Sequence, residues 1–261
     1  MHKKIGAAVV AAGAMMLALG AQAKDLGEIR WGTDPSNAPF ESKGKSGKLQ
    51  GFDIELGEAI CVQLKARCTW VENDFDGMIP ALKAKKFDAI NSSMSATDKR
   101  LKEIDFSSRV TRVPGRMIAR VGANLTPTPE GLKGKRVGVQ QGTTHETYVK
   151  EKWAAAGVEV VSYIRNDMVY ADLQAGRIDA GVLDSVAANE EFLKQPIGQG
   201  FAFAGPAIQD EKIFGKGTGF GVRRDNVDLK NALNKALAEL KANGTFKKIM
   251  ARHFELDVSG D

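Results

Sequence analysis

One stretch, Phe87–Arg100, gathers side chains that can bind a small carboxylate. A short apolar run ending at Ala89-Ile90 predicts a buried strand, and Thr97-Asp98 has the chemistry of a helix N-cap, so the chain turns here from strand to helix. Such a turn presents backbone N–H groups at the positive end of a helix, with Arg100 in its first turn. Three hydroxyls add hydrogen-bonding groups: Ser92, Ser93 and Ser95. On this stretch alone the alternative stays open that the serines only cap the helix and Arg100 lies in solvent.

A second strand end carries an acid where the first carries serines. Leu82–Ala89 and Leu173–Ala180 share the pattern Leu-x-Ala-x-basic-apolar-Asp-Ala, which predicts a helix end, a tight turn and a buried strand in both places. The second copy leads through the strand Ala180–Leu183 to Asp184. Equivalent strand ends therefore offer a carboxylate-binding surface and an acid suited to an ammonium group. Any α/β protein can reuse this pattern, so it is weak evidence for an internal duplication.

The sequence lacks most of the residues and motifs that metal, catalytic and nucleotide-binding sites require. Apart from His2, only His145 and His253 are present, too few for multi-histidine metal sites or for much histidine-dependent catalysis. Gly44-Lys45-Ser46 ends like a phosphate-binding loop, but Pro39 stands where that loop needs glycine. Neither the dinucleotide pattern Gly-x-Gly-x-x-Gly nor the hydrolase pattern Gly-x-Ser-x-Gly occurs. We therefore expect no metal, no cofactor, and binding in preference to covalent chemistry.

Residues 1–23 have the three parts of a signal peptide. Met1–Lys4 is basic, Ile5–Leu19 is apolar, and Ala21-Gln22-Ala23 is a small-x-small cleavage site, so the mature chain is expected to begin near Lys24. No cysteine follows the cleavage site to carry a lipid, and no later apolar run approaches the roughly 20 residues of a membrane span. The sequence predicts an exported, soluble protein.

The charge of the chain is only mildly basic. There are 37 basic and 32 acidic residues, and the formal charge of +5 falls to +3 without Lys3 and Lys4 of the signal peptide. Nucleic-acid binding requires clusters of basic residues, which are absent from this sequence. We expect no nucleic-acid partner.

Two cysteines, Cys61 and Cys68, lie at the end of one amphipathic segment and the start of the next apolar one. In an oxidising compartment a disulfide that joins a helix end to the following strand is favoured over two free buried thiols. The spacing is not the Cys-x-x-Cys of a redox pair, and no histidine lies beside the thiols to complete a zinc site.

The predicted elements follow the order β-α-β-α-β, and the chain builds this unit twice. In the first unit the strands and helices are Glu28–Thr33, Phe52–Leu64, Thr69–Val71, Asp76–Ala84 and Phe87–Ile90, with a polar loop at Asp34–Gln50. In the second they are Arg136–Gln140, a helix after Gln141–Thr144, Val158–Tyr163, Met168–Ala175 and Ala180–Leu183. The pattern is interrupted at Ser107–Gly115 and Gly215–Gly219, and helices follow at Leu229–Leu240 and Thr245–Phe254. This order predicts an α/β fold whose sites lie at the carboxyl ends of parallel strands.

The sequence resembles the periplasmic lysine/arginine/ornithine- and histidine-binding proteins of ABC importers, in solute-binding protein family 3. The match runs from about Ile29 to the C-terminus through ordered motifs: Gly32–Pro35, Ala38–Glu41, Gly51–Ile54, Ile79–Lys86, the Phe87–Arg100 stretch, Lys133–Val139, Gln141–Thr144 and Gly176–Ala180. The resemblance implies a two-lobed periplasmic-binding-protein fold, in which two crossing strands join lobes built on mostly parallel sheets flanked by helices. Lobe 1 would hold residues 24–111 and 218–261 and lobe 2 residues 114–217, with hinges near 111–113 and 215–218.

The same resemblance implies a role for each candidate site residue. Arg100 would bind the ligand α-carboxylate with help from Ser95 and Thr144, and Asp184 would bind the α-ammonium with Ser92 and Ser93. At the side-chain end, Asp34 would face a distal cation and Phe75 would pack on the aliphatic part. The chain departs from its relatives at three pocket positions and has Asn37 for tyrosine, Gln140 for leucine and His145 for glutamine. The Cys61–Cys68 disulfide also matches the family.

By resemblance, then, the expected function is capture of an amino acid in the periplasm and delivery to the membrane permease of an ABC importer. The ligand is expected to be cationic, arginine first, then lysine, ornithine or histidine, and the protein a monomer and not an enzyme. Alternatives stay open: glutamine or an arginine-derived opine as ligand, a periplasmic enzyme such as a dehydratase with His145 as general acid, or a sensory module that presents its closed form to a receptor.

Overall fold

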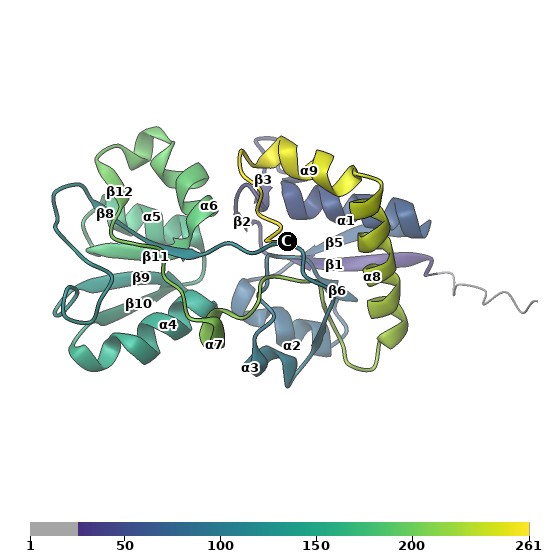
Figure 1. Cartoon of the computed structure of the whole chain (residues 1–261), viewed down its shortest axis with the longest axis horizontal. Coiled ribbons are helices and arrows are strands. Elements are labelled where there is room, and N and C mark those ends of the chain that lie inside the picture. Colours follow the sequence, from purple (N-terminus) through teal and green to yellow (C-terminus); the bar gives the residue numbers. More distant parts are fainter. Residues whose placement is uncertain (1–25, 261) are drawn as a thin grey trace, which may run out of the picture.

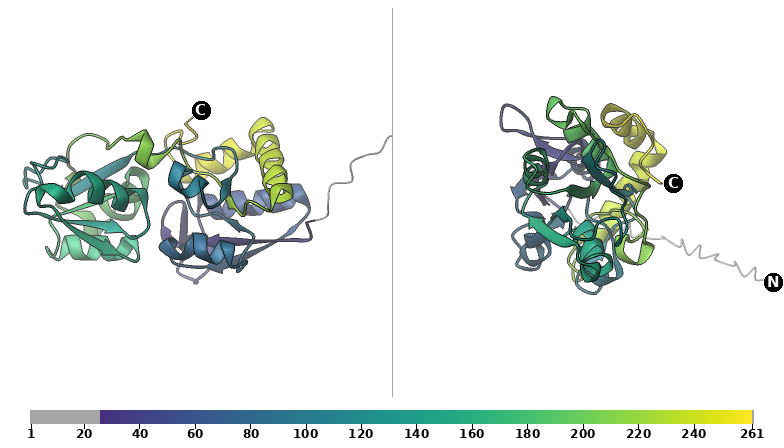
Figure 2. Two further views of the ribbon diagram at one scale, coloured as in Figure 1. Left: turned by 90° about the horizontal axis from the view of Figure 1, so that it is seen from below. Right: turned by 90° about the vertical axis from the view of Figure 1, so that its left-hand side faces the viewer.

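The structure is a computed structural model that describes residues 26–260. The predicted signal peptide, residues 1–23, lies outside the described residues. The chain forms two lobes side by side, each built on a five-stranded sheet with helices packed against it (Figures 1 and 2). Within the described range, no helix is long and apolar enough to cross a membrane.

The sheet of the first lobe joins strands from both ends of the chain. Its order is β5 (Arg67–Glu72), β1 (Glu28–Thr33), β6 (Ala89–Ile90), β13 (Gly221–Val222) and β7 (Asp105–Phe106). The strands β5, β1 and β6 are parallel, as the β-α-β-α-β order predicts, whereas β13 pairs antiparallel with β6 and β7. The antiparallel half arises because β13 re-enters this lobe after the chain has built the second one.

Helices cover both faces of this sheet. One core cluster contains Trp31 and Ala89 and includes residues of α1 (Phe52–Leu64), α8 (Val227–Ala242) and α9 (Thr245–His253). A second cluster contains Ile90 and residues of α2 (Met78–Lys83), and Phe75 of η1 (Phe75–Gly77) packs against it. The short helix α3 (Asp98–Leu101) follows β6. Ala89 and Ile90 belong to different clusters because successive residues of a strand point to opposite faces. The apolar stripe predicted for α8 is buried, at Leu229, Leu233, Ala236, Leu237 and Leu240.

The predicted polar loop Asp34–Gln50 contains a small antiparallel sheet. Its strands are β2 (Ser36–Asn37), β3 (Glu41–Lys43) and β4 (Leu49–Gln50). These strands have two or three residues, too few for an alternating pattern to show in the sequence. Phe40 is buried against Phe254 and Phe52, with ring centroids 4.9 and 6.5 Å away, and so fixes β2 and β3 to the first lobe.

The second lobe repeats the arrangement. Its sheet has the order β10 (Glu159–Tyr163), β9 (Arg136–Gln140), β11 (Ala180–Asp184), β8 (Gly115–Arg120) and β12 (Phe201–Phe203). The strands β10, β9 and β11 are parallel, and β8 and β12 are antiparallel to their neighbours. The remaining elements are α4 (Thr144–Lys152), η2 (Ala154–Ala156), α5 (Asn166–Gln174), α6 (Ser185–Ala187), η3 (Ala188–Leu193), η4 (Pro196–Gly198) and α7 (Glu211–Phe214). The predicted α/β class with two lobes is confirmed, with sheets that are mixed.

The repeated sequence pattern has a common backbone conformation. Lys85 and Gly176 occupy the same place in the two copies, between a helix and a buried strand, and have φ values of 60° and 71°. Each turn leads into the strand whose end lies at the cleft, β6 in the first lobe and β11 in the second. The pattern therefore corresponds to one turn used twice.

Two segments connect the lobes, and they are hydrogen-bonded to each other. The Thr218 N–H donates to the Thr111 carbonyl at 2.8 Å, and the two threonine hydroxyls lie 2.7 Å apart. The Arg112 N–H donates to the carbonyl of Val258 at 2.7 Å, so the C-terminal segment lies against the first connection, and Figure 1 shows the C-terminus there. Both connections fall where the sequence pattern is interrupted. Bending at these residues stays a prediction.

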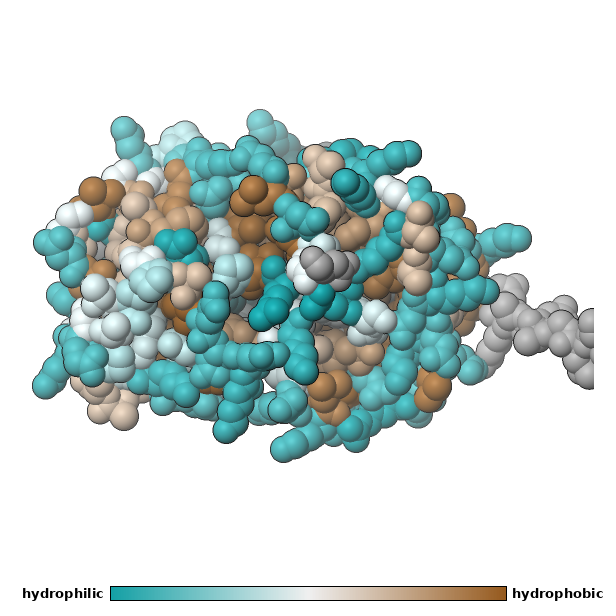
Figure 3. Space-filling view, in the orientation of Figure 1, coloured by the Kyte–Doolittle hydropathy of each residue, from teal (hydrophilic) through white to brown (hydrophobic). Residues whose placement is uncertain are grey.

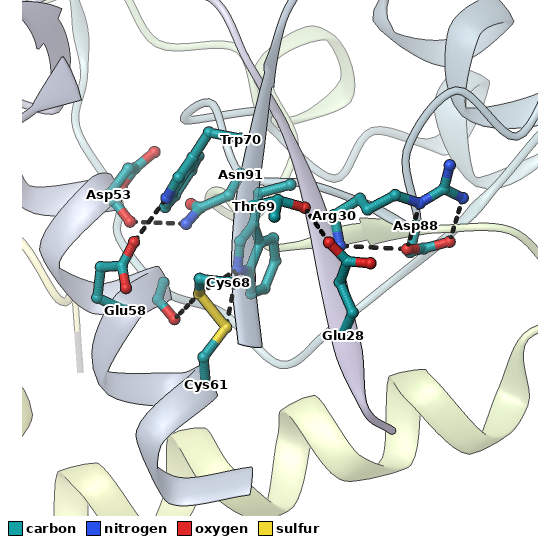
Figure 4. The surroundings of a disulfide bond; sticks show 12 residues. Glu28, Arg30, Asp53, Glu58, Cys61, Cys68, Thr69, Trp70, Asp88 and Asn91 are labelled. Carbon is teal, nitrogen blue, oxygen red and sulfur yellow. Dashed lines mark hydrogen bonds and ion pairs between the residues drawn. A yellow bond between two sulfur atoms is a disulfide. The ribbon is translucent and has the colours of Figure 1, made fainter. Parts of the chain in front are cut away.

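The predicted disulfide is confirmed. Cys61 in α1 and Cys68 in β5 are bonded, and the indole N–H of buried Trp31 lies 3.4 and 3.2 Å from the two sulfur atoms. Figure 4 shows the bond where the end of α1 meets the start of β5. The covalent link therefore ties a covering helix to an edge strand of the first sheet.

We expect the variant Cys61→Ala/Cys68→Ala to lose about 2 to 3 kcal/mol of unfolding free energy, because a link over so short a loop removes only a limited amount of unfolded-state entropy. Urea unfolding of the variant and of the wild type, in the absence of ligand, measures the difference. Wild type unfolded in the presence of a reducing agent should behave like the variant. Equal midpoints for the oxidised wild type and the variant would contradict the expectation.

Candidate functional site

A cavity of about 460 Å³ lies between the two lobes. This volume is within the range of small-molecule pockets, roughly 300 to 1,000 Å³. Every ligand-binding residue predicted from the sequence lines it: Asp34, Asn37, Phe75, Ser92, Ser93, Ser95, Arg100, Gln140, Thr144, His145 and Asp184. The fold thus brings these residues together from both lobes, and their binding of a ligand stays a prediction.

Arg100 is a buried cation on the wall of this cavity. Its guanidinium donates from Nη1 to the Ser95 carbonyl and from Nη2 to the Gly142 carbonyl, each at 2.9 Å, and lies 5.4 Å from the centre of the Phe75 ring. Burial lowers the pKa of Arg100 to about 10, so the group is charged at neutral pH. Among the described residues no carboxylate lies within ion-pair distance of it. An anion from outside the chain would supply the missing charge.

The N-terminus of α4 faces the same cavity. Thr143 caps the helix by accepting the Glu146 N–H at 3.1 Å, and Glu146 accepts the Gly142 N–H at 2.7 Å. The arrangement is close to a capping box, except that Glu146 accepts from the residue before the N-cap, and Thr144 and His145 lie in the first turn. Because a helix N-terminus favours negative charge, α4 supports an anion near Arg100.

Asp184 ends β11 and provides a carboxylate from the second lobe. Its Oδ1 accepts the N–H groups of Val186 and Ala187 at 2.8 and 3.1 Å, which caps α6. Burial raises the pKa of Asp184 to about 6, although the two backbone N–H groups lower it, and the carboxylate is mainly ionised at neutral pH. It has no ion-pair partner in the part of the chain that the structure describes. The two lobes therefore place an unpaired cation, Arg100, and an unpaired anion, Asp184, on the wall of the same cavity.

Asp34 is another acid on the cavity wall without an ion-pair partner among residues 26–260. The Gln140 amide nitrogen donates to Asp34 Oδ2 at 2.6 Å across the lobes, and the Asp34 N–H donates to the Ser92 hydroxyl oxygen at 2.9 Å. Burial raises the pKa of Asp34 to about 6, against the hydrogen bonds from Ser36 and Gln140, which lower it. The site thus contains a carboxylate that a distal cation could pair.

Asn37 and His145, two of the pocket residues that depart from the relatives, both contact neighbouring side chains. Asn37 donates to Glu41 and accepts from Asn166 of the second lobe, both at 3.4 Å. His145 is half-buried, with its ring centroid 5.6 Å from that of Phe214. Burial, helped by the charge of Arg100, lowers the pKa of His145 to about 4, so the imidazole is neutral at pH 7. A neutral imidazole is a poor general acid, which argues against the dehydratase alternative.

Sequence reasoning missed two acids that orient the serines. Glu41 accepts the Ser92 hydroxyl at 3.2 Å, and Asp53 accepts the Ser93 N–H at 2.7 Å. The Ser93 hydroxyl lies 3.1 Å from Asp53 and 3.3 Å from Glu41, and its one proton can be donated to either acid. Burial and the neighbouring Asp53 hold the pKa of Glu41 well above its usual range. A serine that donates its proton to an acid keeps lone pairs free to accept from a ligand ammonium. The sequence pattern that could have pointed to these acids is an acid directly after an aromatic residue, as in Phe40-Glu41 and Phe52-Asp53.

The chain is similar to known periplasmic amino-acid-binding proteins. The chain is 52% identical to the histidine-binding periplasmic protein of Escherichia coli (strain K12) over 232 residues, 89% of each chain. It is also 52% identical to the lysine/arginine/ornithine-binding periplasmic protein of the same strain over 233 residues, 89% of this chain and 90% of the relative.

A solved structure described as an ancestral arginine-binding protein bound to arginine matches with a TM-score of 0.82 and 36% identity, over 87% of this chain and 98% of that one. Residues 29–256 match the family of bacterial extracellular solute-binding proteins, family 3. The family match covers both lobes and all the residues that line the cavity. This chain belongs to the bacterial extracellular solute-binding proteins, family 3.

Proposed function

We propose that this protein captures a cationic amino acid in the periplasm, arginine before lysine, ornithine or histidine, and delivers it to the membrane permease of an ABC importer. The observation that carries the proposal is the pair of unpaired charges in one cavity, Arg100 from the first lobe and Asp184 from the second. An α-amino acid at neutral pH carries the complementary charges on adjacent groups, a carboxylate and an ammonium. Burying charges is favourable only when each has a partner, and this ligand supplies both.

The distal part of the cavity supports a cationic side chain. Asp34 adds a second ionised carboxylate, which a distal cation on the ligand can pair. Phe75 offers an aromatic ring for the aliphatic part of the ligand. Both relatives named above are described as binders of cationic amino acids or histidine. Arginine fits first because its guanidinium donates several hydrogen bonds in a plane to carboxylate, amide and hydroxyl oxygens.

Closure of the lobes would complete the site. Residues 24–111 and 218–261 would move against residues 114–217 about hinges near 111–113 and 215–218. Ligand bound to Arg100 of the first lobe would gain the Asp184 contact only when the lobes meet, so it would stabilise the closed form by that difference in contacts. A permease would then recognise the closed shape.

The location and partners belong to the same proposal. Residues 1–23 would direct export and be removed, which leaves a monomer in the periplasm. The face in Figure 3 is mostly hydrophilic, with its apolar residues in separate groups. The exposed large apolar side chains are spread along the chain and include Val62, Val121, Ile197 and Leu256. Scattered apolar residues of this kind are usual on monomeric proteins.

A thermal-shift screen against all amino acids, with octopine and nopaline as opines, tests the proposal. Ligand at 100 times its Kd stabilises the folded protein by about 2.7 kcal/mol, which gives a readily measured rise in Tm. We expect the largest rise with arginine and smaller rises with lysine, ornithine or histidine. A rise with glutamine or an opine alone would replace the ligand, and no rise with any cationic amino acid would reject the ligand class.

The affinity for arginine is expected to fall below pH 6. Asp34 and Asp184 have pKa values near 6 in the protein, and a bound cation favours their ionised forms, so binding at lower pH must first remove protons. Each acid should cost about 10-fold in Kd between pH 7.5 and pH 5, because one pH unit below a pKa leaves about a tenth of the group ionised. Isothermal titration at the two pH values measures this, and Asp34→Asn should halve the slope of log Kd against pH. An unchanged Kd would contradict the expectation.

A further inference from the structure

One helical turn of the second lobe reaches the first lobe beside the cleft. The turn η3 is π-helical, a rare conformation that is frequent at functional sites, and it continues from α6, which Asp184 caps. Glu191 in η3 accepts the N–H of Ala38 at 2.5 Å. Ala38 directly follows β2, and Figure 1 shows α6 on the side of the second lobe that faces β2 and β3. The segment from Asp184 through α6 to η3 therefore contains both the proposed ammonium contact and a contact between the lobes.

This contact differs from the other polar contacts across the cleft. Among the described residues these are Gln140 to Asp34 and Ser36, Arg100 to the Gly142 carbonyl, Asn166 to Asn37, Ala38 to Glu191, and the exposed pair Lys194 and Glu255. The first three use side chains that line the cavity, so a ligand that binds those side chains competes with them. Glu191 is not among the lining residues. Its bond to the first lobe can therefore form together with a bound ligand.

The same turn offers a weaker contact for comparison. Lys194, at the end of η3, lies 3.1 Å from Glu255 of the C-terminal segment, and their side chains are 41% and 84% exposed. Exposed ion pairs contribute little, typically about 0.2 to 1 kcal/mol, because water and salt screen them. Loss of the Glu191 bond instead leaves the half-buried Ala38 N–H without a partner. Burial therefore makes Glu191 the stronger link.

We propose that Glu191 is a closure residue, which holds the second lobe against Ala38 of the first and so prolongs the time that the ligand stays bound. The inference rests on the proposed function, ligand capture between two lobes. A contact present only when the lobes meet stabilises the closed form and slows opening. Affinity changes of this kind act mainly through the dissociation rate.

The protonation state of Glu191 determines which substitution should preserve its contact with Ala38. Burial raises the pKa of Glu191 to about 8, although the Ala38 N–H and the Tyr170 hydroxyl lower it. Its Oε2 atom is buried and has no hydrogen-bond partner within the described residues. Burying a neutral carboxyl with one unpartnered oxygen costs less free energy than burying a carboxylate in the same place, so the neutral form is favoured at pH 7. Glutamine has the same shape and the same accepting oxygen, so Glu191→Gln should retain the contact.

Stopped-flow binding of L-arginine to four variants tests the proposal. We expect Glu191→Ala to raise the dissociation rate about 5- to 10-fold, the effect of losing one partly buried hydrogen bond, with the association rate changed less than about twofold. The conservative Glu191→Gln, the exposed-pair variant Lys194→Ala and the surface control Glu151→Ala should each stay within about twofold of wild type. A dissociation rate for Glu191→Ala equal to that of wild type would overturn the proposal.

Amide hydrogen exchange at Ala38, with and without L-arginine, separates this inference from the proposed function. If wild type fails to bind arginine, the proposed function is contradicted, and exchange in the ligand-free protein decides the role of Glu191. We expect the Ala38 amide to exchange more slowly in wild type and in Glu191→Gln than in Glu191→Ala. Equal exchange in the three proteins under both conditions would overturn the closure role.

Discussion

Arg100→Ala is expected to weaken the binding of L-arginine by about 3 to 5 kcal/mol, or roughly two to four orders of magnitude in Kd. The guanidinium is the buried cation of the cavity, and its loss would leave the ligand carboxylate opposed only by the N-terminus of α4. Helix termini typically contribute only about 0.3 to 1 kcal/mol to an anion, so α4 cannot replace the side chain. Isothermal titration of wild type and variant measures the change.

Two controls give this result its meaning. Lys99→Ala removes an exposed cation from the position next to Arg100 and should change the Kd less than about twofold. Arg100→Lys keeps a charge but not the planar guanidinium, and should fall between wild type and the alanine variant. Circular dichroism melts establish that each variant is folded. Binding by Arg100→Ala within a few-fold of wild type would show that the carboxylate lies elsewhere.

Asp184→Asn is expected to cost a similar 3 to 5 kcal/mol of binding, on the order of what one unpaired buried charge costs. The substitution removes the partner of the ligand ammonium and retains the size of the side chain. It also retains an oxygen that can accept the N–H groups of Val186 and Ala187, so the cap of α6 should survive. We therefore expect a large loss in Kd from isothermal titration without a comparable fall in the Tm of the ligand-free protein.

A ligand without the ammonium group provides the matching control. The compound 5-guanidinopentanoate is arginine without its α-amino group, and it should bind weakly and about equally to wild type and to Asp184→Asn. If the variant lost as much affinity for this compound as for arginine, Asp184 would act on another part of the ligand or through the fold of the second lobe.

Much of the site could be predicted because short local patterns mark the ends of strands. The turn from Ile90 into Thr97-Asp98 predicted the place of Arg100, and the same turn chemistry after β9 and β11 predicted Thr144 and Asp184. Each of these residues follows a buried strand that lies in the parallel part of a sheet. Strand ends of that kind meet at one edge of each sheet, so local patterns marked the candidate residues within each lobe. That the two edges face one cavity followed only from the family resemblance.

Contacts that depend on tertiary structure could not be predicted in the same way. Glu41 lies in a strand of three residues inside a predicted loop, and its role follows from two serines more than fifty positions away. Glu191 lies in a helical turn that carries no apolar period of its own, and its partner is a backbone N–H of the other lobe. The antiparallel strand β13 depends on the return of the chain between lobes, which no local pattern marks.

The central claim is that Arg100 binds the ligand carboxylate. Its most direct test is a thermodynamic cycle of two proteins, wild type and Arg100→Ala, and two ligands, arginine and agmatine, which is arginine without its carboxylate. Isothermal titration gives the four Kd values for wild type and variant with arginine and with agmatine. The account predicts that removal of Arg100 matters only when the carboxylate is present, with a coupling free energy of roughly 2 kcal/mol or more. Equal losses for both ligands, and so a coupling near zero, would contradict it.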